Sequence, residues 1–119
     1  MTKPFPLDSY EPSIRRMGSP VVARDPLQEV VTPIGGSIYA LVTMTITIEC
    51  PVSAEPLADI SWYHNNSLLS DRSTAFQDKT TDALIIPKLN TTNEGEYKCV
   101  ATNSMGRDIA SSQVNLLRK

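Results

Sequence analysis

Alternating apolar and polar residues divide much of the chain into short strands. The runs 46–50, 60–62 and 97–101 each place every second side chain on one face. Cys50, Trp62 and Cys99 share the inward phase of these runs, so two cysteines and a tryptophan point into one core. The pattern predicts an all-β protein in which the two cysteines can bond across the core.

Similar but shorter patterns predict the remaining strands. Strand-like residues between 20 and 42 are interrupted by Pro26 and Pro33 and by a turn at Gly35-Gly36, as in an edge strand that breaks and crosses between sheets. Further strands are predicted at 44–50, 59–64, 72–78, 83–89, 96–102 and 109–117. Their expected inward residues include Phe76, Leu84, Ile86, Leu89, Val114 and Leu116.

The order and spacing of four features resemble an immunoglobulin domain of the I-set. They are Cys50, Trp62, the run Asn93-Glu94-Gly95-Glu96-Tyr97-Lys98-Cys99 and the run Ala101-Thr102-Asn103-Ser104-Met105-Gly106. The resemblance implies an immunoglobulin-like Greek-key β-sandwich of two antiparallel sheets, with Tyr97 as the tyrosine corner and Leu84 in the core. It also implies a Cys50–Cys99 disulfide packed against Trp62. Closing that loop would stabilise the fold by about 4 kcal/mol on a chain-entropy estimate.

Two positions depart from the family's pattern. Thr43 stands where the family usually has a turn glycine, so the geometry of that turn is open. Asn93 stands where the family usually has an aspartate. In the family, that aspartate pairs with an arginine at the start of the strand that is predicted here at 72–78. Asn93 could instead hydrogen-bond Arg72 or a backbone group, without a full charge.

The chain of 119 residues is long enough for one core, and we expect one domain at residues 20–119. Residues 1–19 contain three prolines and no period, which predicts a disordered arm or linker with Arg15-Arg16 in solvent. The first residues lack the apolar segment of a signal peptide. An extracellular domain would therefore be a fragment of a longer chain.

Composition and motifs argue against catalysis and against several ligand classes. The net charge of −2 gives no basic footprint for nucleic acid, and no apolar run is long enough to insert into a membrane. His64 is the only histidine and is expected to be exposed, with no second metal ligand or orienting carboxylate beside it. Asp78 and Asp82 could hold a weak calcium ion, but solvated turn residues are the favoured interpretation. We expect no cofactor and no metal.

Surface features provide the remaining candidates. The sequons at Asn65 and Asn90 fall in predicted turns, where a glycan would leave the core undisturbed. Because Trp62 and Cys99 point inward, Tyr63, Lys98 and Val100 must point outward from neighbouring strands, which makes them a candidate binding face. The competing interpretation is that these residues are scattered surface positions.

We therefore expect a non-catalytic protein-binding or adhesion module of a larger extracellular or cell-surface protein. Candidate parents are adhesion or guidance receptors and modular glycoproteins of the ADAMTS-like, papilin or peroxidasin groups. Two alternatives stay open. One is a cytoplasmic scaffold module of the muscle cytoskeleton, in which the cysteines would stay reduced. The other is a spacer or accessory domain of a multidomain enzyme. The identity of the protein partner and the oligomeric state are unknown at this point.

Overall fold

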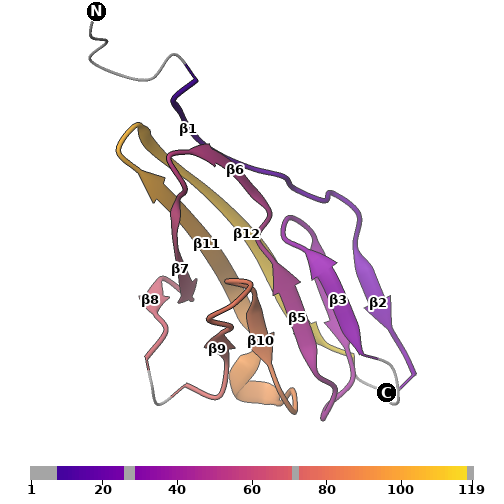
Figure 1. Ribbon diagram of the computed structural model, residues 1–119. Coiled ribbons are helices and arrows are strands. Elements are labelled where there is room, and N and C mark those ends of the chain that lie inside the picture. Colours follow the sequence, from indigo (N-terminus) through magenta and orange to yellow (C-terminus); the bar gives the residue numbers. More distant parts are fainter. Residues whose placement is uncertain (1–7, 26–28, 71–72, 118–119) are drawn as a thin grey trace, which may run out of the picture.

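Two packed sheets form the body of the structure, a computed structural model that describes residues 8–25, 29–70 and 73–117. The smaller sheet has the order β3-β5-β10-β9, formed by β3 (Val30–Pro33), β5 (Ile46–Glu49), β10 (Leu84–Ile86) and β9 (Phe76–Gln77). The larger sheet has the order β2-β4-β12-β11-β7-β8, formed by β2 (Val21–Ala23), β4 (Ser37–Ala40), β12 (Gly106–Leu116), β11 (Gly95–Asn103), β7 (Asp59–His64) and β8 (Ser67–Leu68). This arrangement confirms the predicted β-sandwich (Figure 1). The sheets are not wholly antiparallel as expected, because β3 pairs with β5, and β4 pairs with both β2 and β12, in parallel orientation.

A third, two-stranded sheet lies at the upper end of the sandwich in the view of Figure 1. It pairs β1 (Tyr10–Ile14) with β6 (Val52–Glu55) in antiparallel orientation. At the opposite end, a 3₁₀ helix, η1 (Thr91–Asn93), connects β10 to β11. Asn90 caps η1, and its side chain accepts a hydrogen bond from the Thr92 backbone N–H at 2.8 Å.

The chain crosses between the two sheets near its beginning, as the proline breaks predicted. Strand β2 lies at the edge of the larger sheet, β3 joins the smaller sheet beside β5, and β4 returns to the larger sheet beside β12. Gly35 makes the turn between β3 and β4 with φ +130°, a conformation that disfavours any side chain. A Cβ there would also overlap the Met17 backbone, so this glycine permits close contact with the N-terminal segment.

The core between the sheets is built from the inward phases of the strands. Trp62, Tyr97, Leu84 and Cys99 are all buried. The other large side chains that are fully buried are Ile34, Ile38, Met44, Ile46, Ile48, Ile86, Leu89 and Val114. Cys50 follows β5 and forms a disulfide with Cys99 of β11, which confirms the predicted bridge between the sheets.

The structure differs from the disordered arm or linker expected over residues 1–19. Residues 1–7 lie outside the described part, but residues 10–14 form β1, and Pro12 and Ile14 are buried against the sandwich. The Arg15 backbone N–H donates to the Pro51 carbonyl at 2.9 Å, and the Met17 N–H donates to the Ile34 carbonyl at 2.8 Å. Two apolar side chains and regular backbone pairing are therefore enough to dock this segment.

Strand β9 also corrects a prediction. Phe76 was expected to point inward, but it is 49% exposed, and Ala75 is the buried residue of this segment at 1% exposed. Strand β9 has only two residues. In a longer strand, alternation over several residues fixes which side chains point inward, and two residues are too few for this. The expected start of the strand at Arg72 lies outside the described residues.

The first testable prediction concerns Ile14. Ile14→Ala should lower the free energy of unfolding by about 2–4 kcal/mol, because it removes a buried side chain and leaves a cavity. Chemical denaturation checks this, with Ser13→Ala on the exposed side of β1 as the matched control, expected to change stability by less than about 0.5 kcal/mol. Equal stability of the two variants would show that β1 does not dock in solution.

The second prediction concerns the turn before β5. Thr43 has φ +76°, which is unfavourable for a β-branched residue, and the family's usual glycine would relieve it. Thr43→Gly should therefore raise the free energy of unfolding by about 1 kcal/mol. Val42→Gly, at the neighbouring exposed position, should lower it by about 0.5–1 kcal/mol through backbone entropy. A loss of stability in both variants would contradict the strain argument.

Candidate functional site

The outward side of the larger sheet carries the candidate binding face. Tyr63 of β7 lies directly opposite Lys98 of β11 in the antiparallel register, and Val100 lies opposite Ser61. All three candidate residues, Tyr63, Lys98 and Val100, are half-buried. Side chains opposite each other on one face of an antiparallel pair lie close enough to interact. The register therefore brings the three candidates together on adjacent strands.

Two exposed apolar residues extend this face beyond the predicted set. Leu68 of β8 pairs with Tyr63 and is 61% exposed. Ile109 of β12 pairs with Val100 and is 44% exposed. The four apolar side chains therefore form two cross-strand pairs, Leu68–Tyr63 on β8 and β7 and Val100–Ile109 on β11 and β12. Between β7 and β11, Tyr63 pairs with Lys98 and Val100 pairs with Ser61. We call Leu68, Tyr63, Lys98, Val100 and Ile109 the outer face.

Ile109 was missing from the sequence prediction, although a signal for it was present. Val114 and Leu116 were assigned the inward phase, and the same alternation places Ile109 on the opposite side. Leu68 follows from its position at the end of a tight turn, where it becomes the partner of Tyr63. Neither assignment requires more than the strand period and the pairing register.

Lys98 is held in place by polar neighbours. Its Nζ donates to the Asn66 side-chain oxygen at 2.6 Å and lies 3.7 Å from a Glu96 carboxylate oxygen. An exposed ion pair of this kind adds little stability. Its effect is to fix the position of the ammonium group beside Tyr63 and Val100, between the two apolar pairs, with Ser111 opposite Lys98 and Ser61 opposite Val100.

Behind the outer face, the core residues are fixed by hydrogen bonds as well as by packing. The Trp62 indole N–H donates to the Asp82 carbonyl at 2.8 Å, and the Tyr97 hydroxyl donates to the Asn93 carbonyl at 2.6 Å. The second bond is the tyrosine corner. Burial raises the pKa of Tyr97 to about 12, against a smaller lowering by the hydrogen bond with Asn93. Tyr97 is therefore neutral across the physiological range.

His64 is not the exposed residue that the sequence suggested. Its ring stacks on Tyr97 with centroids 4.2 Å apart, and its Nε2 lies 2.9 Å from the Glu94 carbonyl. His64 shares the inward phase of Trp62 near the end of β7, so it packs at the rim of the core. Its contacts are those of a structural residue.

Asn93 takes over the role that the family usually gives to an ion pair. Its side-chain nitrogen donates to the Thr74 hydroxyl at 3.1 Å, and its side-chain oxygen accepts the Asn90 backbone N–H at 3.0 Å. These contacts satisfy both ends of a buried amide. The possible partner Arg72 lies outside the described residues.

The two sequon asparagines have different surroundings. The Asn65 side-chain oxygen accepts the Glu96 backbone N–H at 3.0 Å, and the whole amide group lies against Gly95. The Asn90 side-chain oxygen accepts hydrogen bonds from the backbone N–H and the hydroxyl of Thr92. Asn65 lies in the turn after β7, as predicted, whereas Asn90 is the N-cap of η1 and has an extended backbone.

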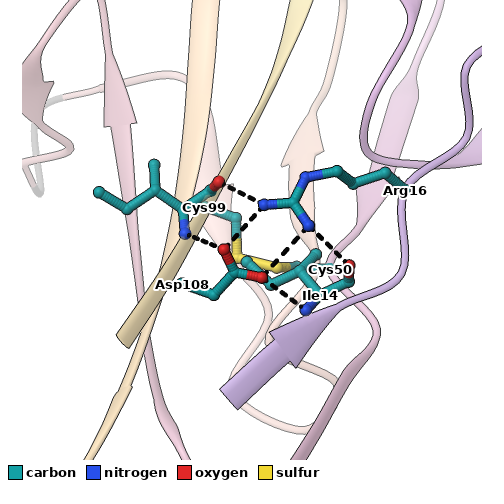
Figure 2. Close-up of polar contacts among 6 residues, drawn as sticks. Ile14, Arg16, Cys50, Cys99 and Asp108 are labelled. Carbon is teal, nitrogen blue, oxygen red and sulfur yellow. Dashed lines mark hydrogen bonds and ion pairs between the residues drawn. A yellow bond between two sulfur atoms is a disulfide. The ribbon is translucent and has the colours of Figure 1, made fainter. Parts of the chain in front are cut away.

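An ionic contact joins the N-terminal segment to β12, and the sequence prediction missed it. Arg16 was expected in solvent, but its guanidinium donates to both carboxylate oxygens of Asp108, at 2.8 and 3.2 Å, and to the Ile109 carbonyl at 2.6 Å (Figure 2). Asp108 also accepts the Ile14 backbone N–H at 2.9 Å. Figure 2 also draws the Cys50–Cys99 disulfide. We call the Arg16–Asp108 contact the clasp.

Asp108 has the inward phase of β12, which explains why it needs these partners. The hydrogen bonds from Arg16 hold the pKa of Asp108 below its usual range, aided by the N–H groups of Ile14 and Ile109 and opposed by partial burial. The same interaction raises the pKa of Arg16. The clasp thus joins two oppositely charged groups across the open edge of the sandwich.

Within residues 8–25, 29–70 and 73–117, no cluster of three or more histidine, cysteine, aspartate or glutamate residues could hold a metal ion. Asp78 accepts bonds from the Thr80 N–H and the Thr81 hydroxyl, which lower its pKa, and Asp82 accepts a bond from Gln77. The same part of the chain contains no helix that is long and apolar enough to cross a membrane.

Two sheets in this order, bridged by a disulfide beside Trp62, define an immunoglobulin-like β-sandwich. The profile of the Immunoglobulin I-set domain family matches residues 29–116, and the chain belongs to this family. The match begins after β2, so β1, β2 and the clasp residue Arg16 lie upstream of the part that defines the family.

Curated relatives share this domain but are far longer. Human ADAMTS-like protein 3 is 31% identical over 86 residues, which cover 72% of this chain and 5% of that protein. Human contactin-2 is 34% identical over 76 residues, which cover 64% of this chain and 7% of contactin-2. Human ADAMTS-like protein 1 is 25% identical over 117 residues, covering 92% of this chain and 6% of that protein. The chain thus spans only a small part of these relatives.

Solved structures agree on the fold. A chimeric titin Z1Z2 structure has a TM-score of 0.72 at 18% identity and covers 95% of this chain and 100% of that chain. The neural ectodermal development factor IMP-L2 has a TM-score of 0.62 at 29% identity and covers 66% of this chain and 38% of that chain. These similarities establish the sandwich and leave its binding partner open.

The third prediction concerns the pH dependence of the clasp. Because the pKa of Asp108 is lower in the folded protein, its charge stabilises the fold above the unfolded-state value near 3.8. That contribution is lost as the pH falls through the folded-state pKa. Asp108→Asn should lower the free energy of unfolding by about 0.5–1 kcal/mol at neutral pH. The difference from wild type should shrink toward zero as the pH falls through the folded-state pKa of Asp108.

Urea unfolding of both proteins across this pH range measures the effect. Arg16→Gln is the matched control, because it removes the cation and leaves the carboxylate in place. Its difference from wild type should shrink over the same acid range. Stability curves for wild type and Asp108→Asn that stay parallel down to the lowest pH would show that Asp108 is not ion-paired in solution.

Proposed function

We propose that this domain is a non-catalytic protein-binding module and that it binds through the outer face. The supporting observation is a set of two apolar cross-strand pairs, Leu68–Tyr63 and Val100–Ile109, on four neighbouring strands. Lys98 links them, because it pairs with Tyr63 and lies two residues before Val100 on β11. Aromatic and apolar residues with few charges are the type enriched at the centres of protein interfaces. Lys98 adds one positioned cation, which favours a partner with an acidic or carbonyl group opposite it.

The proposed setting is extracellular or at a cell surface, within a longer chain. The Cys50–Cys99 disulfide supports an oxidising compartment. Similarity to ADAMTS-like protein 3 and contactin-2 supports a modular parent, since the matched domain is a small part of each. A cytoplasmic scaffold is the second candidate, supported by a 31% match over 74 residues to Drosophila melanogaster Titin. Intact mass with and without reductant, on protein isolated from its natural source, separates the two settings.

The fourth prediction tests the outer face directly. Fluorescently labelled 119-residue protein is applied to live mammalian cells and to the matrix they deposit, and bound protein is measured against concentration. Tyr63→Ala with Val100→Asp should weaken binding at least tenfold, which corresponds to about 1.4 kcal/mol. The variant should unfold with wild-type cooperativity, because both side chains lie on the outward phase.

The control is a matched double change on the other sheet. Phe76→Ala with Val31→Asp alters an exposed aromatic residue and an exposed valine of β9 and β3. This control should bind like wild type. Equal binding by both variants would mean that the outer face is inert. Absence of binding by wild type would favour the spacer role over a direct binding role.

A further inference from the structure

We propose that Asn90, and not Asn65, carries the N-glycan in the folded, secreted protein. Both residues begin an Asn-x-Ser/Thr sequon, so the sequence alone treats them alike. The structure gives the two side-chain amides different environments, and these environments carry the proposal. The argument is independent of whether the outer face binds a partner.

The Asn65 amide is part of the structure that joins the β7–β8 turn to β11. The Asn65 backbone N–H donates to the Glu96 carbonyl at 2.8 Å, and the Asn65 side-chain oxygen accepts the Glu96 N–H at 3.0 Å. Two reciprocal bonds therefore tie one residue of the turn to one residue of the strand. This arrangement fixes the side chain as well as the backbone.

Gly95 makes close packing of the Asn65 amide possible. A Cβ on Gly95 would collide with the oxygen, nitrogen and carbon of the Asn65 amide alike, so the whole group lies against the glycine backbone. The side-chain nitrogen also lies 3.4 Å from Nε2 of His64, which stacks on Tyr97. The nitrogen that would carry a sugar thus lies within contact distance of His64 and against Gly95, although Asn65 as a whole is exposed.

The Asn90 amide uses only its oxygen in the hydrogen bonds described for it. That oxygen accepts from the backbone N–H and the hydroxyl of Thr92, the third residue of the same sequon. Asn90 precedes η1 with an extended backbone, φ −143° and ψ −179°, at the end of the sandwich away from β1 (Figure 1). A substituent on its nitrogen leaves the cap and the core contacts of Leu89 intact.

The modification itself is a group transfer that occurs before folding is complete. The asparagine nitrogen forms a bond to the anomeric carbon of a lipid-diphosphate-linked oligosaccharide, the bond from that carbon to the diphosphate oxygen breaks, and the amide loses one proton to a base of the transferase. Selection between the sites then follows from folding. A chain modified at Asn65 has to place a sugar where the amide contacts Gly95 and His64, whereas a chain modified at Asn90 folds without that conflict.

The choice between Asn65 and Asn90 also decides whether a glycan lies near the outer face. The next residue, Asn66, holds Lys98 of the outer face at 2.6 Å. A glycan at Asn65 would stand beside Lys98 and Tyr63, whereas one at Asn90 lies beyond the end of β10. The proposed pattern therefore leaves the outer face uncovered.

The fifth prediction tests this assignment. The 119-residue chain is secreted from mammalian cells behind a cleavable signal sequence, and each site is scored by enzymatic glycan release in heavy-oxygen water with peptide mass mapping. Asn90→Gln should abolish the glycan mass of the secreted protein. Ser67→Ala, which destroys the Asn65 sequon and keeps the Asn65 contacts, should leave that mass unchanged. Wild-type protein that is secreted with its glycan on Asn65, or with none, would overturn the proposal.

A second variant distinguishes a folding defect caused by a glycan on Asn65 from inefficient transfer of the glycan to Asn65. Ser67→Thr with Thr92→Ala presents only the Asn65 sequon, in its threonine form. Modified chains of this variant should be retained in the cell, and the secreted fraction should carry no glycan. Thr92→Ala alone is the matched control and should be secreted unmodified. A secreted, disulfide-bonded variant with a glycan on Asn65 and a wild-type melting temperature would contradict the proposed conflict.

Discussion

The Cys50–Cys99 disulfide is the constraint on which the rest of the structure depends. It joins the end of β5 in one sheet to the centre of β11 in the other and closes a loop of 49 positions. On a chain-entropy estimate such a loop contributes about 4 kcal/mol, a large share of the net stability of one domain. Because the bond requires Cys99 to point inward, it also fixes the phase of β11. Lys98 and Val100 must then face outward, so the same constraint builds the core and the outer face.

The N-terminal segment provides the polar partners of Asp108 at the open edge of the two sheets. Asp108 lies on the inward phase of β12, where an unpaired carboxylate would be costly. Arg16 supplies the charge, and Ile14 supplies a backbone N–H and a buried side chain. Asn103 adds a further link by donating to the carbonyls of Tyr10 and Pro56 at 3.0 and 2.9 Å. The segment is upstream of the family match, yet it completes the packing of this sandwich.

The sequence predicted those parts of the fold in which periodicity and special residues agree. The bounds of β7 and the burial of Trp62, Tyr97 and Leu84 follow from strict alternation around the disulfide. The prediction that Phe76 points inward was wrong because β9 has two residues, and alternation in so short a strand does not fix which side chain faces the core. The prediction of a disordered N-terminal segment was wrong for a different reason. Average composition over nineteen residues hid a five-residue strand whose docking depends on backbone pairing and on Asp108, more than ninety positions away.

The candidate site was predictable to the extent that it follows from strand phase. Tyr63, Lys98 and Val100 were found from their neighbours in the core, whereas Ile109 and the positioning of Lys98 by Asn66 required the pairing register. The difference between the two sequons could not be predicted from the sequence, because it depends on contacts between Asn65 and Gly95, which are thirty positions apart in the chain. Side-chain contacts of this kind leave no local pattern in a sequence.

Strand β11 connects all of these features. Gly95 at its start receives the Asn65 amide, Lys98 and Val100 near its middle form the outer face, and Asn103 at its end holds the N-terminal segment. The disulfide fixes the centre of the strand, and pairing with β12 and β7 holds both of its edges. Side chains carried on such a strand lose little freedom when a partner binds, which lowers the entropic cost of association. A strand held at its centre and along both edges therefore suits the proposed binding role, because its outward side chains start from fixed backbone positions.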